Sequence, residues 1–142
     1  RDRQMELPVG MFNFVPAADG VDGTIAASAI AQAGDEVRDA LLTLRRGRVA
    51  QLRAAQGDAW IRARMREVGA DGDRIATIFL NTHPLVAGHG VVVDIGANWE
   101  NGGRNRAVRM RRMTIRLPDA TVTADGRPIM TGGRIDWETL VR

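Results

Sequence analysis

Arginine is concentrated in one short stretch of this chain. Residues 104–116 contain Arg104, Arg106, Arg109, Arg111, Arg112 and Arg116. A guanidinium keeps its positive charge and offers forked N–H donors, which suit the two oxygens of a carboxylate. Such a group can bind acidic side chains or the C-terminus of a peptide. The other interpretation is a plain solvated strand face, because every basic residue of the chain is an arginine and lysine is absent.

Other patterns that could support catalysis or metal binding are weak. His83 and His89 could form a facial triad with Asp94, but both lie in an apparent loop without the spacing of a helical metal site. Without cysteine, thiol catalysis and cysteine zinc sites are excluded. No phosphate-binding loop, nucleophile elbow or dinucleotide fingerprint occurs. The loop at 98–103 could hold an anion through its backbone amides, with a plain glycine-rich turn as the alternative.

Composition limits the class of protein. The 142 residues fit one domain, with 44% hydrophobic and 26% charged residues, as in ordinary globular proteins. The net charge of +3 and the 4% aromatic content argue against nucleic-acid binding, which favours a stronger basic excess with interleaved aromatics. No apolar run approaches the ~20 residues that span a bilayer. We therefore expect a single cytoplasmic domain, 1–142, that binds neither nucleic acid nor membrane.

Short apolar runs alternate with turn signals along most of the chain. The turns contain an aspartate followed by glycine, as in Asp71-Gly72 and Asp125-Gly126. The apolar runs predict strands at 11–15, 24–30, 75–80, 91–95, 121–123 and 128–130. Gly47 predicts a hairpin between 37–44 and 49–52, with this glycine in the left-handed region. A helix over 37–44 also fits the spacing of its apolar residues.

One segment has the periodicity of an amphipathic helix. Its apolar residues recur three or four positions apart, namely Trp60, Ile61, Met65 and Val68. We predict a helix over Asp58–Val68, with Asp58 capping its first turn and Gly69 ending it. The expected fold class is therefore α+β, a β-rich single domain with one main amphipathic helix.

The arginine-rich stretch itself reads as a strand over 104–117. Val108 and Met110 alternate with arginines, but further on Met113, Ile115 and Leu117 form the apolar set. The alternation slips by one residue at Arg111-Arg112, and a β-bulge there would keep one face buried.

The order of these signals resembles the C-terminal domain of the M29 aminopeptidases and of the related dihydroxypyridine dioxygenases. The resemblance extends over nearly all of the chain, and the N-terminal domain of that family has no counterpart. The matching stretches are Leu7-Pro8-x-Gly10-x-Phe12 with Pro16 and Val21-x-Gly23, Gly47-Arg48-Val49, Ile95-Gly96-Ala97-Asn98, Gly102-Gly103-x-Asn105-Arg106, and Asp125-Gly126 with Gly132.

The resemblance also indicates that the metal ligands of that family are replaced. A gap-free match places Arg109 and Arg111 at a histidine and an aspartate ligand, Thr77 at a glutamate and Val92 near a histidine. The second glutamate has no counterpart, since no acidic residue lies between Asp73 and Asp94. Guanidinium has no lone pair to offer a divalent ion. We therefore expect no catalytic residue, no metal and no cofactor.

Peptide binding without peptide cleavage is the function that this reasoning favours. The expected peptide-binding residues are Arg104, Arg106, Arg109, Arg111, Arg112, Trp99, Asn98 and Thr77. An exposed sheet edge can also take up an extended peptide as an added strand. Domains stripped of ligands in this way resemble accessory proteins of ribosomal-peptide natural-product pathways, such as the crocagin type, which present a precursor peptide to modifying enzymes.

Two other classes remain open from the sequence. The first is a regulatory or structural subunit that pairs with itself, as a homodimer, or with a full-length M29-like enzyme. The second is an enzyme of rearranged chemistry.

Overall fold

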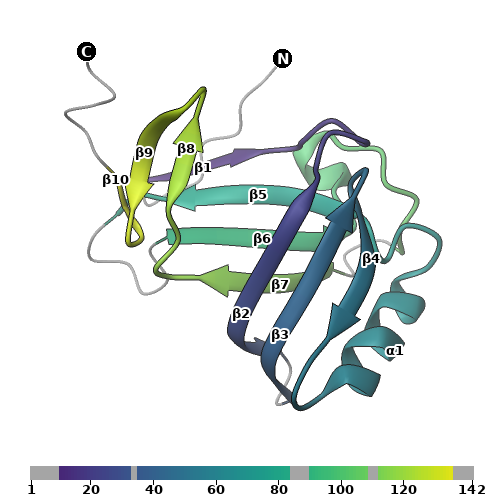
Figure 1. Cartoon of the computed structure of the whole chain (residues 1–142). Coiled ribbons are helices and arrows are strands. Elements are labelled where there is room, and N and C mark those ends of the chain that lie inside the picture. The colour runs from purple at the N-terminus through teal and green to yellow at the C-terminus, as the bar shows by residue number, and fades with distance from the viewer. Residues whose placement is uncertain (1–9, 33–34, 84–89, 109–111, 136–142) are drawn as a thin grey trace. The chain divides into compact units, whose positions relative to one another are not determined.

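Strands make up most of the computed structural model, which describes residues 10–32, 35–83, 90–108 and 112–135. Three sheets are formed, with strand orders β1-β5-β6-β7, β2-β3-β4 and β10-β9-β8 (Figure 1). The elements are β1 (Met11–Phe14), β2 (Gly23–Gln32), β3 (Asp35–Arg45), β4 (Arg48–Arg53), α1 (Asp58–Val68), β5 (Ile75–Asn81), β6 (Gly90–Gly96), a short 3-10 helix η1 (Trp99–Asn101), β7 (Arg112–Leu117), β8 (Val122–Ala124), β9 (Arg127–Thr131) and β10 (Arg134–Ile135). Within the described ranges this is the expected β-rich α+β fold with one main helix.

The antiparallel sheet β2-β3-β4 has one buried face and one exposed face. Ile25 pairs with Leu42 and both are buried, whereas the adjacent pair Ala26 and Leu41 is exposed. Leu44 pairs with Val49, so the predicted hairpin is confirmed, and Gly47 takes a φ of 72° in its turn. The helix alternative over 37–44 is wrong, because the apolar residues of this segment serve a strand.

Helix α1 has the predicted bounds and follows β4. Ile61 and Val68 are fully buried, while Trp60 and Met65 are half-buried. The predicted cap is corrected: Gly57, in the left-handed region, is the N-cap, and no side chain caps the helix. Asp58 is the first helical residue and its carboxylate accepts a hydrogen bond from Arg62 Nε at 2.9 Å, one turn on.

Strands β5 and β6 are the most deeply buried of the described strands. Every residue of β6 is buried, as are Ile75, Ala76, Thr77 and Phe79 of β5. Both were predicted from continuous apolar runs, the pattern of strands covered on both faces.

The predicted strand over 104–117 is shorter than expected. Strand β7 begins at Arg112, with Met113 and Ile115 buried as predicted. Residues 104–108 form an irregular segment, and Val108 is 47% exposed. The reason is that the Asn105 side chain binds two backbone carbonyls, which holds this segment out of strand geometry. Residues 109–111, where the β-bulge was predicted, lie outside the described residues.

The chain divides into two compact units. One takes in the described parts of Arg1–Asn13, Phe79–Val92 and Arg116–Arg142, and the other consists of Phe14–Ile78 and Val93–Ile115. The second unit contains β2, β3, β4, α1 and η1. In the described residues, no helix is long and apolar enough to cross a membrane.

Candidate functional site

The loop after β6 is held by two asparagine side chains. Asn98 is buried, and its amide donates to the Ala76 carbonyl at 3.1 Å and accepts from the Asn105 N–H at 3.0 Å. Asn105 in turn donates to the carbonyls of Ile75 and Gly96. These bonds satisfy backbone groups where β5 begins and β6 ends. The loop at 98–103, which could have bound an anion, is therefore held in place by these side-chain hydrogen bonds. We call the hydrogen bonds of Asn98 and Asn105 the Asn98 clip.

Gly103 allows this clip to close. Its N–H donates to the Asn98 carbonyl at 2.9 Å, and a Cβ at this position would overlap the Asn98 side chain. Asn98 was predicted to contact peptide, but it is 3% exposed. In this structure it positions the loop that carries Trp99, Glu100 and Arg106.

Asp71 is the centre of a charged cluster in the same unit. Its carboxylate is 7% exposed and lies 2.6 Å from Arg48 Nη2 and 3.5 Å from Arg74 Nε. The backbone N–H of Arg106 donates to the other oxygen at 2.5 Å. Burial alone would raise the pKa of Asp71, but these hydrogen bonds and the charges of Arg48 and Arg74 outweigh burial and lower it. Asp71 is therefore ionised at neutral pH, and it ties the β3–β4 hairpin to the segment 104–106.

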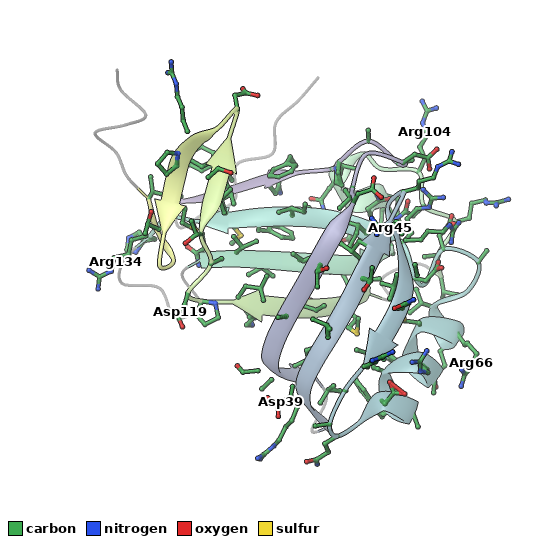
Figure 2. All side chains as sticks on the ribbon, in the orientation of Figure 1. Asp39, Arg45, Arg66, Arg104, Asp119 and Arg134 are labelled. Carbon is green, nitrogen blue, oxygen red and sulfur yellow. The ribbon has the colours of Figure 1, made fainter. Side chains whose placement is uncertain are left out.

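The arginines on the segments that Asp71 joins, together with Arg74, form a group that we call the arginine rim. Arg48 also pairs with Asp73, and Arg46 and Arg74 both approach Asp19. Arg106 and Arg46 remain 83% and 80% exposed despite these neighbours. In Figure 2 the labelled Arg45, the last residue of β3, lies away from the labelled Asp39 in the middle of that strand, and the labelled side chain of Arg104 projects outward. The rim consists of Arg45, Arg46, Arg48, Arg74, Arg104 and Arg106.

A second charged cluster surrounds Asp94 on β6. Asp94 is 2% exposed; one carboxylate oxygen accepts from the Thr114 hydroxyl at 2.7 Å and the other lies 3.2 Å from Arg112 Nε. Arg112 also pairs with Glu100 of η1 at 3.3 Å. The neighbouring Asn101 donates to the Thr77 hydroxyl at 3.1 Å. Here one guanidinium is shared by two carboxylates, so this cluster carries no excess positive charge.

The predicted site residues thus fall into different groups. Arg104 and Arg106 belong to the arginine rim, whereas Arg112, Thr77 and Trp99 lie in or beside the Asp94 cluster. Trp99 is 39% exposed, but Thr77 has no exposed surface. Arg109, Arg111 and His89 lie outside the described residues, and the backbone of His83 hydrogen-bonds to the Asn81 side chain.

Sequence reasoning missed Arg45, Arg46, Arg48 and Arg74 as site residues. The run Arg45-Arg46-Gly47-Arg48 was interpreted only as a hairpin turn. Nothing local indicates that this turn meets Arg106, because the connection passes through Asp71, 23 residues from Arg48. The sequence feature that could have indicated this contact is Asp71 itself, which lies between Gly69 and Gly72 just before the buried strand β5.

Among the residues that the structure describes, no group of three His, Cys, Asp or Glu side chains is placed to hold a metal ion. The carboxylate of Asp94 faces Arg112 and Thr114, and a guanidinium repels a cation.

Comparison with known proteins shows which solved structures share this fold. No family model matches the chain, and no curated protein matches its sequence. Solved structures do match: AmpT from Thermus thermophilus, at a TM-score of 0.68 and 19% identity over 91% of this chain. The 2,5-dihydroxypyridine dioxygenase from Pseudomonas putida KT2440 matches at 0.68 and 15% over 89%.

The chain spans 40% of AmpT and 43% of the dioxygenase, less than half of either protein. At these identities the likeness concerns the fold. It agrees with the order of motifs along the sequence, and both similar structures come from the two groups of proteins that those motifs resemble. The chain therefore has an M29-related fold, similar to one part of AmpT and of the dioxygenase.

Proposed function

We propose that the protein is a non-catalytic accessory protein that binds a peptide and presents it to modifying enzymes, in the biosynthesis of a ribosomal-peptide natural product. The peptide is acidic, either through its side chains or through its C-terminal carboxylate. The observation that supports this proposal is the arginine rim.

The backbone that carries the rim arginines is held rigidly. The backbone of Arg106 is fixed by Asp71, and the hairpin turn is fixed by the bonds of Gly47 O with Ile75 N–H and of Val49 N–H with Asp73 O, both 2.8 Å. Side chains on a fixed backbone lose less freedom when they bind a ligand. The fixed backbone thus presents these guanidiniums at the surface, where their forked donors can meet a carboxylate.

The arginine rim also has more guanidinium groups than carboxylates to balance them. Arg104 is exposed, and its guanidinium forms no ion pair with any described residue. Arg106 lies 3.8 Å from Asp71, which already faces Arg48 and Arg74. The excess of guanidinium over carboxylate attracts an anionic partner, and this attraction weakens as salt is added.

The proposal of a non-catalytic role rests on residue chemistry. At the positions that the resemblance assigns to metal ligands stand Thr77 and Val92, and both are buried. The Thr77 hydroxyl already accepts a hydrogen bond from Asn101. Neither side chain is a metal ligand of the carboxylate or imidazole type.

Calorimetric titration with synthetic peptides tests the proposed function. We expect an acidic peptide to bind more tightly than a neutral peptide of equal length. The double variant Arg104→Ala/Arg106→Ala should weaken binding about tenfold or more, because each charged hydrogen bond contributes ~1.5–3 kcal/mol. The matched control is Arg66→Ala, an exposed arginine on α1 outside the rim. Equal binding of acidic and neutral peptides, or no binding at micromolar concentration, would contradict the proposal.

A further inference from the structure

Strand β2 leaves a long free edge in the sheet β2-β3-β4. It extends over ten residues, Gly23–Gln32, and stands at the end of the strand order with β3 as its neighbour. Apart from its ladder with β3, no backbone hydrogen bond joins β2 to another residue that the structure describes. The outward N–H and C=O groups of such an edge are ready to pair with another strand.

The other edge strands in the described part of the chain are poor sites for strand addition. Strand β4 carries Arg48 and Arg53 and has an irregular register opposite Thr43 and Leu44, and β7 carries Arg112 and Arg116. Strands β1, β8 and β10 have four, three and two residues. Short length, charge and bulges are the usual means of protecting a sheet edge.

None of these means protects β2. Its sequence, GTIAASAIAQ, contains no charged residue and no proline. The side chains on its exposed face are small, namely Thr24, Ala26 and Ser28. A strand laid beside β2 would meet no bulky side chain of β2 on that face.

The first residues of β2 lie at the arginine rim. Gly23 pairs with Leu44, next to Arg45, and the Asp22 carboxylate accepts a hydrogen bond from the Arg46 N–H at 3.1 Å. Val21 is tied to the same turn, since its carbonyl accepts from the Gly47 N–H at 2.8 Å. A strand that runs antiparallel to β2 ends where β2 begins. Its C-terminal carboxylate therefore reaches the rim, whereas a parallel strand would bring its N-terminal ammonium to the arginines.

We propose that the peptide binds as an added strand along the free edge of β2, antiparallel to it, with its acidic C-terminal end at the arginine rim. The inference rests on the proposed function and specifies its binding mode. Backbone hydrogen bonds supply affinity along the edge, and the rim selects the direction and the charge of the end.

Backbone methylation of the peptide tests the strand addition. The probe is a synthetic peptide of about eight residues, alternating serine and valine and ending in two glutamates, which matches β2 at ~3.4 Å per residue. Two versions carry N-methyl groups on alternate amides, one on the odd and one on the even positions. In a strand these two sets of amides point in opposite directions. We expect one version to lose about tenfold or more in affinity and the other to bind like the parent, since each lost backbone bond costs ~1 kcal/mol.

A paramagnetic tag tests the direction. The chain has no cysteine, so one introduced cysteine can be labelled selectively. Thr24→Cys places the tag at the rim end of β2 and Ala29→Cys at the other end, and both positions are exposed. The tag at 24 should broaden the NMR signals of the C-terminal glutamates, and the tag at 29 those of the first residues. The reverse pattern would overturn the antiparallel direction.

The outcomes separate this inference from the proposed function. If the parent peptide binds and both methylated versions bind equally, strand addition is wrong while peptide binding stands. If the parent peptide does not bind at all, the proposed function itself fails. If sedimentation shows a dimer that the peptide does not dissociate, and Ala26→Pro makes it a monomer, the edge belongs to a second copy of the chain and the inference is overturned.

Discussion

Asp71 and Asp94 are both buried aspartates that meet arginine, but the balance of charge around them differs. Asp71 faces Arg48 and Arg74 and fixes the backbone of Arg106. Asp94 shares Arg112 with Glu100 and accepts a further bond from Thr114. The first cluster holds positive charge at the surface, whereas the second neutralises it. The same pair of residue types thus leaves a positively charged surface in one place and a neutral structural contact in another.

The largest effect is expected from removing the charge of Asp71. Asp71→Asn leaves Arg48 and Arg74 without their shared counter-ion, which should cost about 3 kcal/mol of unfolding free energy. Urea unfolding measures this cost. The control is Asp73→Asn, which removes a carboxylate that is 38% exposed and should cost less than about 1 kcal/mol. Equal costs for the two variants would contradict the central position of Asp71.

A smaller loss is expected at Gly103, in the loop that contributes to both clusters. Gly103→Ala forces the added methyl against the Asn98 side chain, with an expected cost of about 2 kcal/mol. Gly102→Ala is the matched neighbour, because its Cβ would meet open space and only its φ of 79° is unfavourable, at about 1 kcal/mol. Thermal unfolding of both variants should rank them in this order. The reverse order would show that the Asn98 side chain moves aside for the methyl group without loss of stability.

Asp94→Asn should be the mildest of the aspartate and glycine changes at buried positions. The amide can still accept from Thr114, and Arg112 keeps Glu100, so about 1 kcal/mol should be lost. Peptide affinity should stay at the wild-type value, in contrast to Asp71→Asn, which loosens the rim. A fall in affinity in Asp94→Asn would mean that the two clusters act together.

The stability that Asp71 contributes should depend on pH. The folded protein holds the pKa of this carboxyl below its unfolded value of about 3.9. Its contribution is therefore fully present above that value and is lost as the pH falls through the folded pKa. Urea midpoints between about pH 2.5 and 6 should show the wild-type advantage over Asp71→Asn constant at the upper end and shrinking below about pH 4. An advantage that persists unchanged in acid would contradict this assignment.

The fold could be predicted wherever residues close together in the sequence determine the structure. Helix α1 follows from the spacing of its apolar residues and Gly69, and the hairpin turn follows from Gly47 between two apolar segments. The segment 104–108 could not, because its alternation of Val108 with arginine is overridden by bonds from Asn105 to the distant Ile75 and Gly96 carbonyls.

The candidate site was predicted only in part for the same reason. Arg104 and Arg106 were identified from their density in the sequence, but their companions Arg46, Arg48 and Arg74 come from other segments. They are gathered by the buried Asp71, and a long-range contact of this kind leaves no pattern in the neighbouring residues. Arg112 was grouped with them by proximity along the chain, although it belongs to the Asp94 cluster.

The uncharged edge strand β2 also affects how readily the protein aggregates in solution. A strand of this length without charge or proline is a template for aggregation when nothing covers it. Occupancy would then act as protection: a ligand that binds only the folded state adds stability by mass action. If a peptide does occupy this edge, we expect the free protein to precipitate sooner than the peptide-bound protein at equal concentration.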